Sequence, residues 1–119
     1  MQYLLLIYGR ESQVAAMSET QLGKVMREYD EFTQSIAASG HLRGGNELDT
    51  TAKATTLRLR EGRRLVTDGP FAETEEQLGG YYLVEAKDLD EALALAARVP
   101  SVRWGSIEVR PIVPHEIPG

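Results

Sequence analysis

The sequence of 119 residues predicts one α+β domain in which two helices cover one face of a mostly antiparallel sheet. Strand-like segments open and close the chain, and two further segments repeat apolar residues at helical spacing. The predicted order is β-α-β, an inserted hairpin, then β-α-β, which is typical of a ferredoxin-like sandwich. We expect residues 1–119 to form this single domain, with about residues 113–119 as a loose C-terminal tail.

The first half of the domain begins with an almost unbroken apolar run at residues 2–8, which predicts a buried strand. Ser18 then stands three residues before Gln21, the spacing of a capping box at a helix start. Apolar side chains recur at helical spacing from residue 22 to residue 36, and Gly40 provides a stop. Residues 18–40 therefore read as the first helix.

A short glycine-containing strand is expected at residues 41–48, followed by a hairpin. Residues 54–60 alternate between apolar and arginine side chains, Glu61-Gly62 forms the turn, and residues 63–67 return. Four arginines cluster on this hairpin. They are typical of a solvated face that protects a strand edge, with anion binding as the alternative.

The second half repeats the strand-helix-strand order. Residues 79–86 predict a strand, and Asp88 is placed to cap a helix whose third position is Glu91. Pro100 ends this helix, and residues 106–112 predict the last strand.

Two of the predicted strands are apolar on both faces. Successive strand residues point to opposite sides, so a half-exposed strand should alternate apolar and polar residues. Two helices cover only one side of the sheet. We therefore expect a homodimer through the open sheet face, and the alternative is a monomer in which residues 43–53 fold over that face. The residues concerned are Leu4, Leu6 and Tyr8 opposite Tyr3, Leu5 and Ile7, and Tyr81 and Leu83 opposite Tyr82 and Val84.

Composition excludes several classes of function. The net charge of −5 argues against nucleic-acid binding, and no apolar run approaches the roughly 20 residues of a membrane helix. The chain has no cysteine and two histidines, so we expect no disulfide, no metal site and no cofactor. No basic and apolar leader precedes the first strand, so we expect a cytoplasmic protein.

The most distinctive stretch is residues 67–86, which reads TDGPFAETEEQLGGYYLVEA. It resembles the D-G-P-F motif of YCII-related proteins, a family of small ferredoxin-like domains, and the resemblance extends over nearly the whole chain. The resemblance implies dimers of the α/β barrel type, with a cleft between the sheet and the loops. It also implies an association with alternative sigma factors.

Within the motif, Pro70 and Gly69 fix a tight turn, and Asp68 can accept hydrogen bonds from the amides that follow it. This structural role and a second role, as a general base or polar anchor at a cleft, both stay open for Asp68. Phe71 follows as a candidate ligand contact.

The carboxylates after Phe71 are expected to form a short helical turn. They are interpreted either as a solvated acidic turn or as a site for a cation or an ammonium group. Glu73 and Glu76 are the candidate binding residues of the second interpretation. Glu75 stands where the family pattern carries lysine, and this removes a positive partner for its neighbours.

His41 and Asp68 are the candidate catalytic pair, because the resemblance implies a histidine and an aspartate in one site and histidine titrates near neutral pH. The alternative for His41 is a surface histidine that interacts favourably with the C-terminal end of the first helix. Two functions follow. One is a small-molecule enzyme with a lyase- or hydrolase-like step in a cleft near the dimer interface. The other is a noncatalytic ligand-binding or regulatory dimer. The expected cleft walls are Tyr3, Tyr8, Tyr81 and Tyr82.

Overall fold

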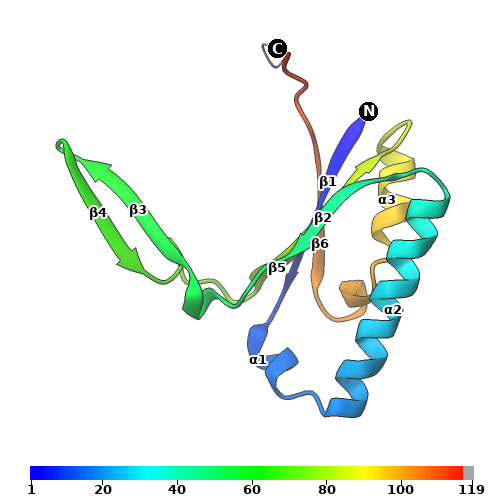
Figure 1. Ribbon diagram of the computed structural model, residues 1–119, viewed down its shortest axis with the longest axis horizontal. Coiled ribbons are helices and arrows are strands. Elements are labelled where there is room, and N and C mark those ends of the chain that lie inside the picture. Colours follow the sequence, from blue (N-terminus) through cyan, green and yellow to red (C-terminus); the bar gives the residue numbers. More distant parts are fainter. Residues whose placement is uncertain (117–119) are drawn as a thin grey trace.

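The computed structural model describes residues 1–116 and confirms the α+β class (Figure 1). The helices are α1 (Glu11–Ala15), α2 (Glu19–Ala38) and α3 (Leu89–Ala96), with short 3-10 turns η1 (Thr51–Lys53) and η2 (Pro100–Arg103). The strands are β1 (Gln2–Gly9), β2 (Leu42–Glu47), β3 (Thr55–Arg60), β4 (Arg63–Asp68), β5 (Gln77–Glu85) and β6 (Ser106–Pro111).

The main sheet has four strands in the order β2-β5-β1-β6, and all its neighbours are antiparallel. With the hairpin left out, this is the strand order of a ferredoxin-like sandwich, as the sequence predicts. The sheet is open at β2 and at β6, so a single chain forms no closed barrel in the part that the structure describes. Strand β1 lies in the interior of the sheet, where Leu5 pairs with Tyr82 on one side and with Val109 on the other.

The hydrophobic core lies between the sheet and helices α2 and α3, which both cover the same face (Figure 1). Strand β1 contributes Tyr3 and Leu5, and α2 contributes Phe32 and Ile36. The side chains of Leu5, Ile36, Val84 and Val99 are fully buried. The inward residues of β1 and β5 are those that the alternation predicts.

The helix ends confirm the predicted caps. The Ser18 side chain accepts from the amide of Gln21 at 3.2 Å, and the Gln21 side chain accepts from the Ser18 amide at 3.0 Å. Asp88 accepts from the amide of Glu91 at 2.9 Å. Gly40 adopts φ 82° after α2, a backbone region that favours glycine.

Helix α1 is not predicted by the sequence, because five residues are too few to show helical periodicity. It is held by Glu11, whose carboxylate accepts from the amide and the hydroxyl of Thr51 at 2.8 and 3.0 Å. The Glu11 amide donates to the side chain of Gln77 at 2.9 Å. These contacts join α1 to η1 and to the start of β5.

The segment after Pro70 corrects one expectation, because residues 70–76 form bends and no helical turn. The hydroxyl of Thr74 donates to the carbonyl of Glu76 at 2.5 Å, and the Gln77 side chain donates to the carbonyl of Thr74 at 2.6 Å. Side-chain bonds to the local backbone compete with helix formation, and here they replace it.

Strands β3 and β4 form a separate two-stranded hairpin, which we call the arm. The arm is inserted between the neighbouring strands β2 and β5. It projects from the sheet on the side opposite to α2 and α3 (Figure 1). Its turn is Glu61-Gly62, where both residues have positive φ, as the hairpin prediction requires.

Candidate functional site

The open face of the sheet carries a row of partly exposed apolar side chains. The register pairs Leu4 with Leu83 and Leu6 with Tyr81, and paired residues share one face. Tyr8 lies on the same face by alternation. All five side chains are intermediate in burial, whereas the opposite face contains the closed core. The structure therefore agrees with the prediction that both faces of β1 and β5 are apolar.

Polar groups border this open face. The Tyr81 hydroxyl accepts from the Asn46 amide at 2.8 Å, and the Tyr8 hydroxyl donates to Glu108 at 3.4 Å. The carboxylate of Glu108 also accepts from Arg110 at 2.8 Å and raises the pKa of that guanidinium. Apolar walls with a few polar groups at the edge are the usual composition of a small-molecule site.

The four tyrosines expected to line one pocket are divided between the two faces. Tyr8 and Tyr81 lie on the open face. Tyr3 is buried in the core, and Tyr82 packs edge-on against Phe32, with ring centroids 5.2 Å apart. The strand alternation in the sequence already separates Tyr81 from Tyr82, so only one tyrosine of each strand can face a common ligand.

His41 lies at the corner between α2 and β2, as predicted from its place after Gly40. Its Nδ1 atom is 2.7 Å from the Ser39 hydroxyl, and its Nε2 atom is 3.2 Å from the Glu91 carboxylate. The side chains of His41 and Glu91 are 27% and 30% exposed. Because a carboxylate only accepts, Nε2 carries the proton, and in the neutral ring Nδ1 accepts from Ser39.

This cluster accommodates either protonation state of His41. The Ser39 hydroxyl also lies 3.2 Å from the carbonyl of Ile36. When Nδ1 gains a proton, Ser39 can turn its hydroxyl hydrogen to that carbonyl and accept from the ring. From the sequence, Glu91 is predicted only as the third residue of a capped helix. Glu91 and His41 are far apart in the chain, so no local signal indicates that they meet.

Asp68 ends β4 at the base of the arm, where it pairs with Thr55. The amide of Gly69 donates to the carbonyl of Ala54 at 2.7 Å, so the expected bond from this amide to the Asp68 carboxylate is not formed. Gly69 has φ 101°, which confirms that the turn needs glycine.

The structure does not bring His41 and Asp68 together within one chain. His41 precedes β2 and Asp68 lies beyond the other end of that strand, in the arm (Figure 1). Six residues of strand correspond to about 20 Å. A direct or single-water hydrogen bond between the two side chains needs a far shorter distance.

The remaining motif residues lie apart from His41. Phe71 is 77% exposed, and its carbonyl accepts from Arg58 at 3.1 Å. Glu76 accepts from the Ser106 hydroxyl at 2.8 Å, Glu75 pairs with Arg10, and Glu73 is exposed. Arg10 thus supplies a positive partner for Glu75, which stands where the resemblance implies a lysine.

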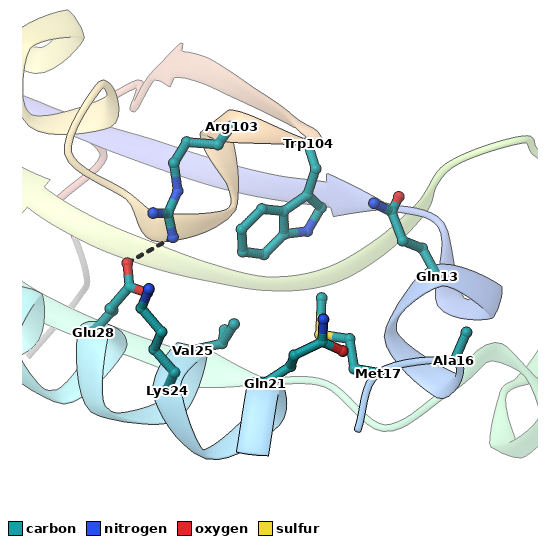
Figure 2. A pocket seen from close by; sticks show the side chains of 9 residues that line it. All are labelled: Gln13, Ala16, Met17, Gln21, Lys24, Val25, Glu28, Arg103 and Trp104. Atoms are coloured by element: carbon teal, nitrogen blue, oxygen red, sulfur yellow. Dashed lines mark hydrogen bonds and ion pairs between the residues drawn. The ribbon is translucent and has the colours of Figure 1, made fainter. Parts of the chain in front are cut away.

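A groove that the sequence does not predict lies on the helical side of the sheet. Its volume is about 530 Å³, and Trp104 from the end of η2 points into it (Figure 2). Arg103 stacks 5.2 Å from the Trp104 ring and pairs with Glu28 at 2.6 Å. The other lining residues are Gln13, Ala16, Met17, Gln21, Lys24 and Val25.

Two features are absent from residues 1–116. No three His, Cys, Asp or Glu side chains lie close enough together to hold a metal ion. No helix there is long and apolar enough to cross a membrane.

Comparison with known proteins agrees with the motif and with the fold. The family described as the YCII-related domain matches residues 1–116. A protein of Rhizobium meliloti (strain 1021), named only as an uncharacterized protein, is 40% identical over 123 aligned positions. The alignment covers 99% of each chain, so the similarity includes the arm and the motif.

Proposed function

Because the chain belongs to the YCII-related family, we propose that it is a homodimeric small-molecule-binding module whose ligand cleft lies at the seam between two open sheet faces. The observation that supports this proposal is the open face itself. Leu4, Leu6 and Leu83 form its apolar centre, and the hydroxyls of Tyr8 and Tyr81 stand at its polar edge.

A second copy is the natural cover for this face. Helices α2 and α3 lie on the other side, and residues 43–53 run through β2 and η1 at the sheet edge (Figure 1). Sheets that pack face to face stand about 10 Å apart and interdigitate side chains. A stable interface buries at least roughly 1,000 Å² in total.

The ligand class follows from the groups at the seam. Tyrosine rings favour a flat aromatic or apolar body, and Arg110 favours an anionic substituent. Arg110 is paired with Glu108, which leaves part of its guanidinium for a second acceptor. A small aromatic anion fits this composition.

Binding of 8-anilino-1-naphthalenesulfonate, a fluorescent aromatic anion, tests the site. We expect saturable binding to the native dimer, weakened about 10-fold by Tyr81→Ala, because aromatic contacts carry much of the energy of such sites. The matched control is Trp104→Phe, which changes the groove on the helical side and should leave the affinity unchanged. If Trp104→Phe weakens binding and Tyr81→Ala does not, the ligand binds in the groove and the proposed site at the seam is wrong.

An enzyme is the second candidate, and the His41 cluster favours it. A histidine held by a carboxylate and a hydroxyl, able to exchange one proton, is a suitable acid-base group. Asp68 could reach His41 only from another chain. The expected result is that His41→Ala abolishes turnover of an identified substrate without loss of the fold, while Ser39→Ala shifts the pH profile. Turnover that survives His41→Ala would end this candidate.

The association with alternative sigma factors, which the resemblance implies, stays a prediction. A regulatory role of this kind requires only the ligand site and the dimer, and no catalytic residue. A regulatory module would bind ligand with unchanged affinity after His41→Ala, and this separates it from the enzyme.

A further inference from the structure

The two strands of the arm pair with each other and form a sheet separate from the main one. Strands β3 and β4 pair over their whole length, from Thr55 opposite Asp68 to Arg60 opposite Arg63. The bond from Arg58 to the Phe71 carbonyl also stays within the arm and its base. Figure 1 shows the hairpin standing clear of the sheet and the helices.

One face of the arm carries three exposed apolar side chains, and the other carries three of the four arginines. The register places Leu57 opposite Val66, and Leu59 opposite Arg64 on the same face. The side chains of Leu57, Val66 and Leu59 are 57%, 60% and 63% exposed. Arg58, Arg60 and Arg63 occupy the other face by alternation, together with Leu65, which pairs with Arg58. We call the face with Leu57, Leu59 and Val66 the apolar face of the arm, and these three side chains are exposed in the single chain.

A two-stranded hairpin alone in water is marginally stable. Exposure of its apolar face to water does not stabilise the hairpin. An exposed apolar β-surface favours association with another chain. The arm is six residue pairs long, with a turn fixed by Glu61 and Gly62. Such a regular, extended ribbon can pack against the surface of another subunit in the assembled protein.

We propose that the arm is a clasp between subunits, in which its apolar face packs against the open sheet face of a second copy of this chain. This inference rests on the proposed dimer and adds its second contact surface. The arm continues the β2–β5 ribbon and leaves the sheet on the side away from the helices (Figure 1). The same partner can therefore touch both the open face and the arm.

Charge complementarity also favours a second copy as the occupant. The arm, residues 55–68, carries four arginines against Glu61 and Asp68, a net charge of +2. The whole chain carries −5, so the rest of it carries −7. A positive arm is attracted to the negative body of another copy, and arms repel other arms.

The absence of cysteine allows a direct test by cross-linking. One chain carries Leu59→Cys in the arm, and a second chain with a different tag carries Leu6→Cys on the open face. Each chain has one thiol, so a disulfide that joins both tags must be intermolecular. We expect this product to form at least about 10-fold faster than with Leu93→Cys, an exposed position on α3, as the partner. Equal rates would overturn the clasp.

Sedimentation equilibrium gives the second test. The double variant Leu57→Asp/Leu59→Asp should raise the dimer dissociation constant about 100-fold or more, since apolar residues at the centre of an interface dominate its affinity. Leu93→Asp is the matched control and should leave the constant unchanged. Circular dichroism verifies that each variant is folded.

The outcomes separate the clasp from the proposed dimer. A wild-type chain that sediments as a monomer at micromolar concentration overturns both. A dimer that Leu6→Asp disrupts and the arm variant does not disrupt overturns the clasp alone. If the arm variant fails to fold, the cross-linking rates still decide the question.

Discussion

The Tyr82 hydroxyl lies 2.7 Å from the hydroxyl of Thr33, and this contact fixes β5 to α2. The Thr33 hydroxyl donates to the carbonyl of Tyr29 at 2.8 Å, so Tyr82 is the donor to Thr33. Tyr81, one residue earlier, accepts from Asn46 on the opposite face. The two adjacent tyrosines thus lie on opposite faces of the sheet, Tyr82 against the core and Tyr81 at the candidate seam.

Tyr82→Phe should therefore destabilise the domain by about 1 kcal/mol, the usual net value of an intramolecular hydrogen bond. Tyr81→Phe removes a more exposed bond and should cost less. Urea denaturation of both variants measures the difference. A smaller loss for Tyr82→Phe than for Tyr81→Phe would contradict this assignment of faces.

Alkaline pH should weaken the fold through two tyrosines. Burial raises the pKa of Tyr82 and of Tyr29 above the ordinary value of 10.0. Between the ordinary and the raised pKa, the folded state holds protons that the unfolded chain has lost, so the free energy of unfolding falls as pH rises. The contribution is complete below pH 10 and disappears as pH rises through the folded pKa.

Urea midpoints measured from pH 8 upward test this dependence. The decline above pH 10 should be shallower in Tyr29→Phe/Tyr82→Phe, and Tyr8→Phe serves as a control on the open face. Identical slopes for the wild type and the double variant would show that other groups cause the decline.

Gly69→Ala should destabilise the protein by about 1–3 kcal/mol, because φ 101° is strained for any residue with a side chain. No atom lies within 4 Å of the added methyl group, so the cost comes from the backbone alone. Gly44→Ala, where φ is ordinary, is the control for chemical denaturation. An unchanged midpoint for Gly69→Ala would mean that the turn relaxes.

Gly105→Ala should destabilise through a clash, by about 1–3 kcal/mol or more. Its added methyl group would overlap the carbonyl oxygen of Tyr8, and both partners are backbone that cannot rotate away. Gly9→Ala adds a methyl group with no neighbour within 4 Å. Thermal unfolding of the two variants should differ by several degrees.

The local parts of the fold could be read from the sequence. The Ser18–Gln21 box and the Asp88 cap depend on residues three positions apart, and the structure confirms both predictions. The faces of β1 and β5 follow from alternation alone. Helix α1 was missed because its stability comes from Glu11 and Thr51, which are distant in sequence.

The candidate site depended on distances that no local pattern contains. The partner of His41 is Glu91, on another helix, and it was identified only from the structure. The position of Asp68 depends on how residues 48–54 and 69–76 bend the arm away from the sheet (Figure 1). The motif predicted the turn at Gly69 but not the direction of the strands that lead to it.

The central position of β1 has a consequence for synthesis. Leu5 pairs with Tyr82 of β5 and with Val109 of β6, so both partner strands of β1 are synthesised long after it. Until β5 and β6 are synthesised, β1 has no partner strand and both of its apolar faces are exposed. Contacts between residues this distant in sequence also form slowly. A nascent chain halted before β6 would expose β1 along one edge, the state that chaperones recognise and that aggregates when they are absent.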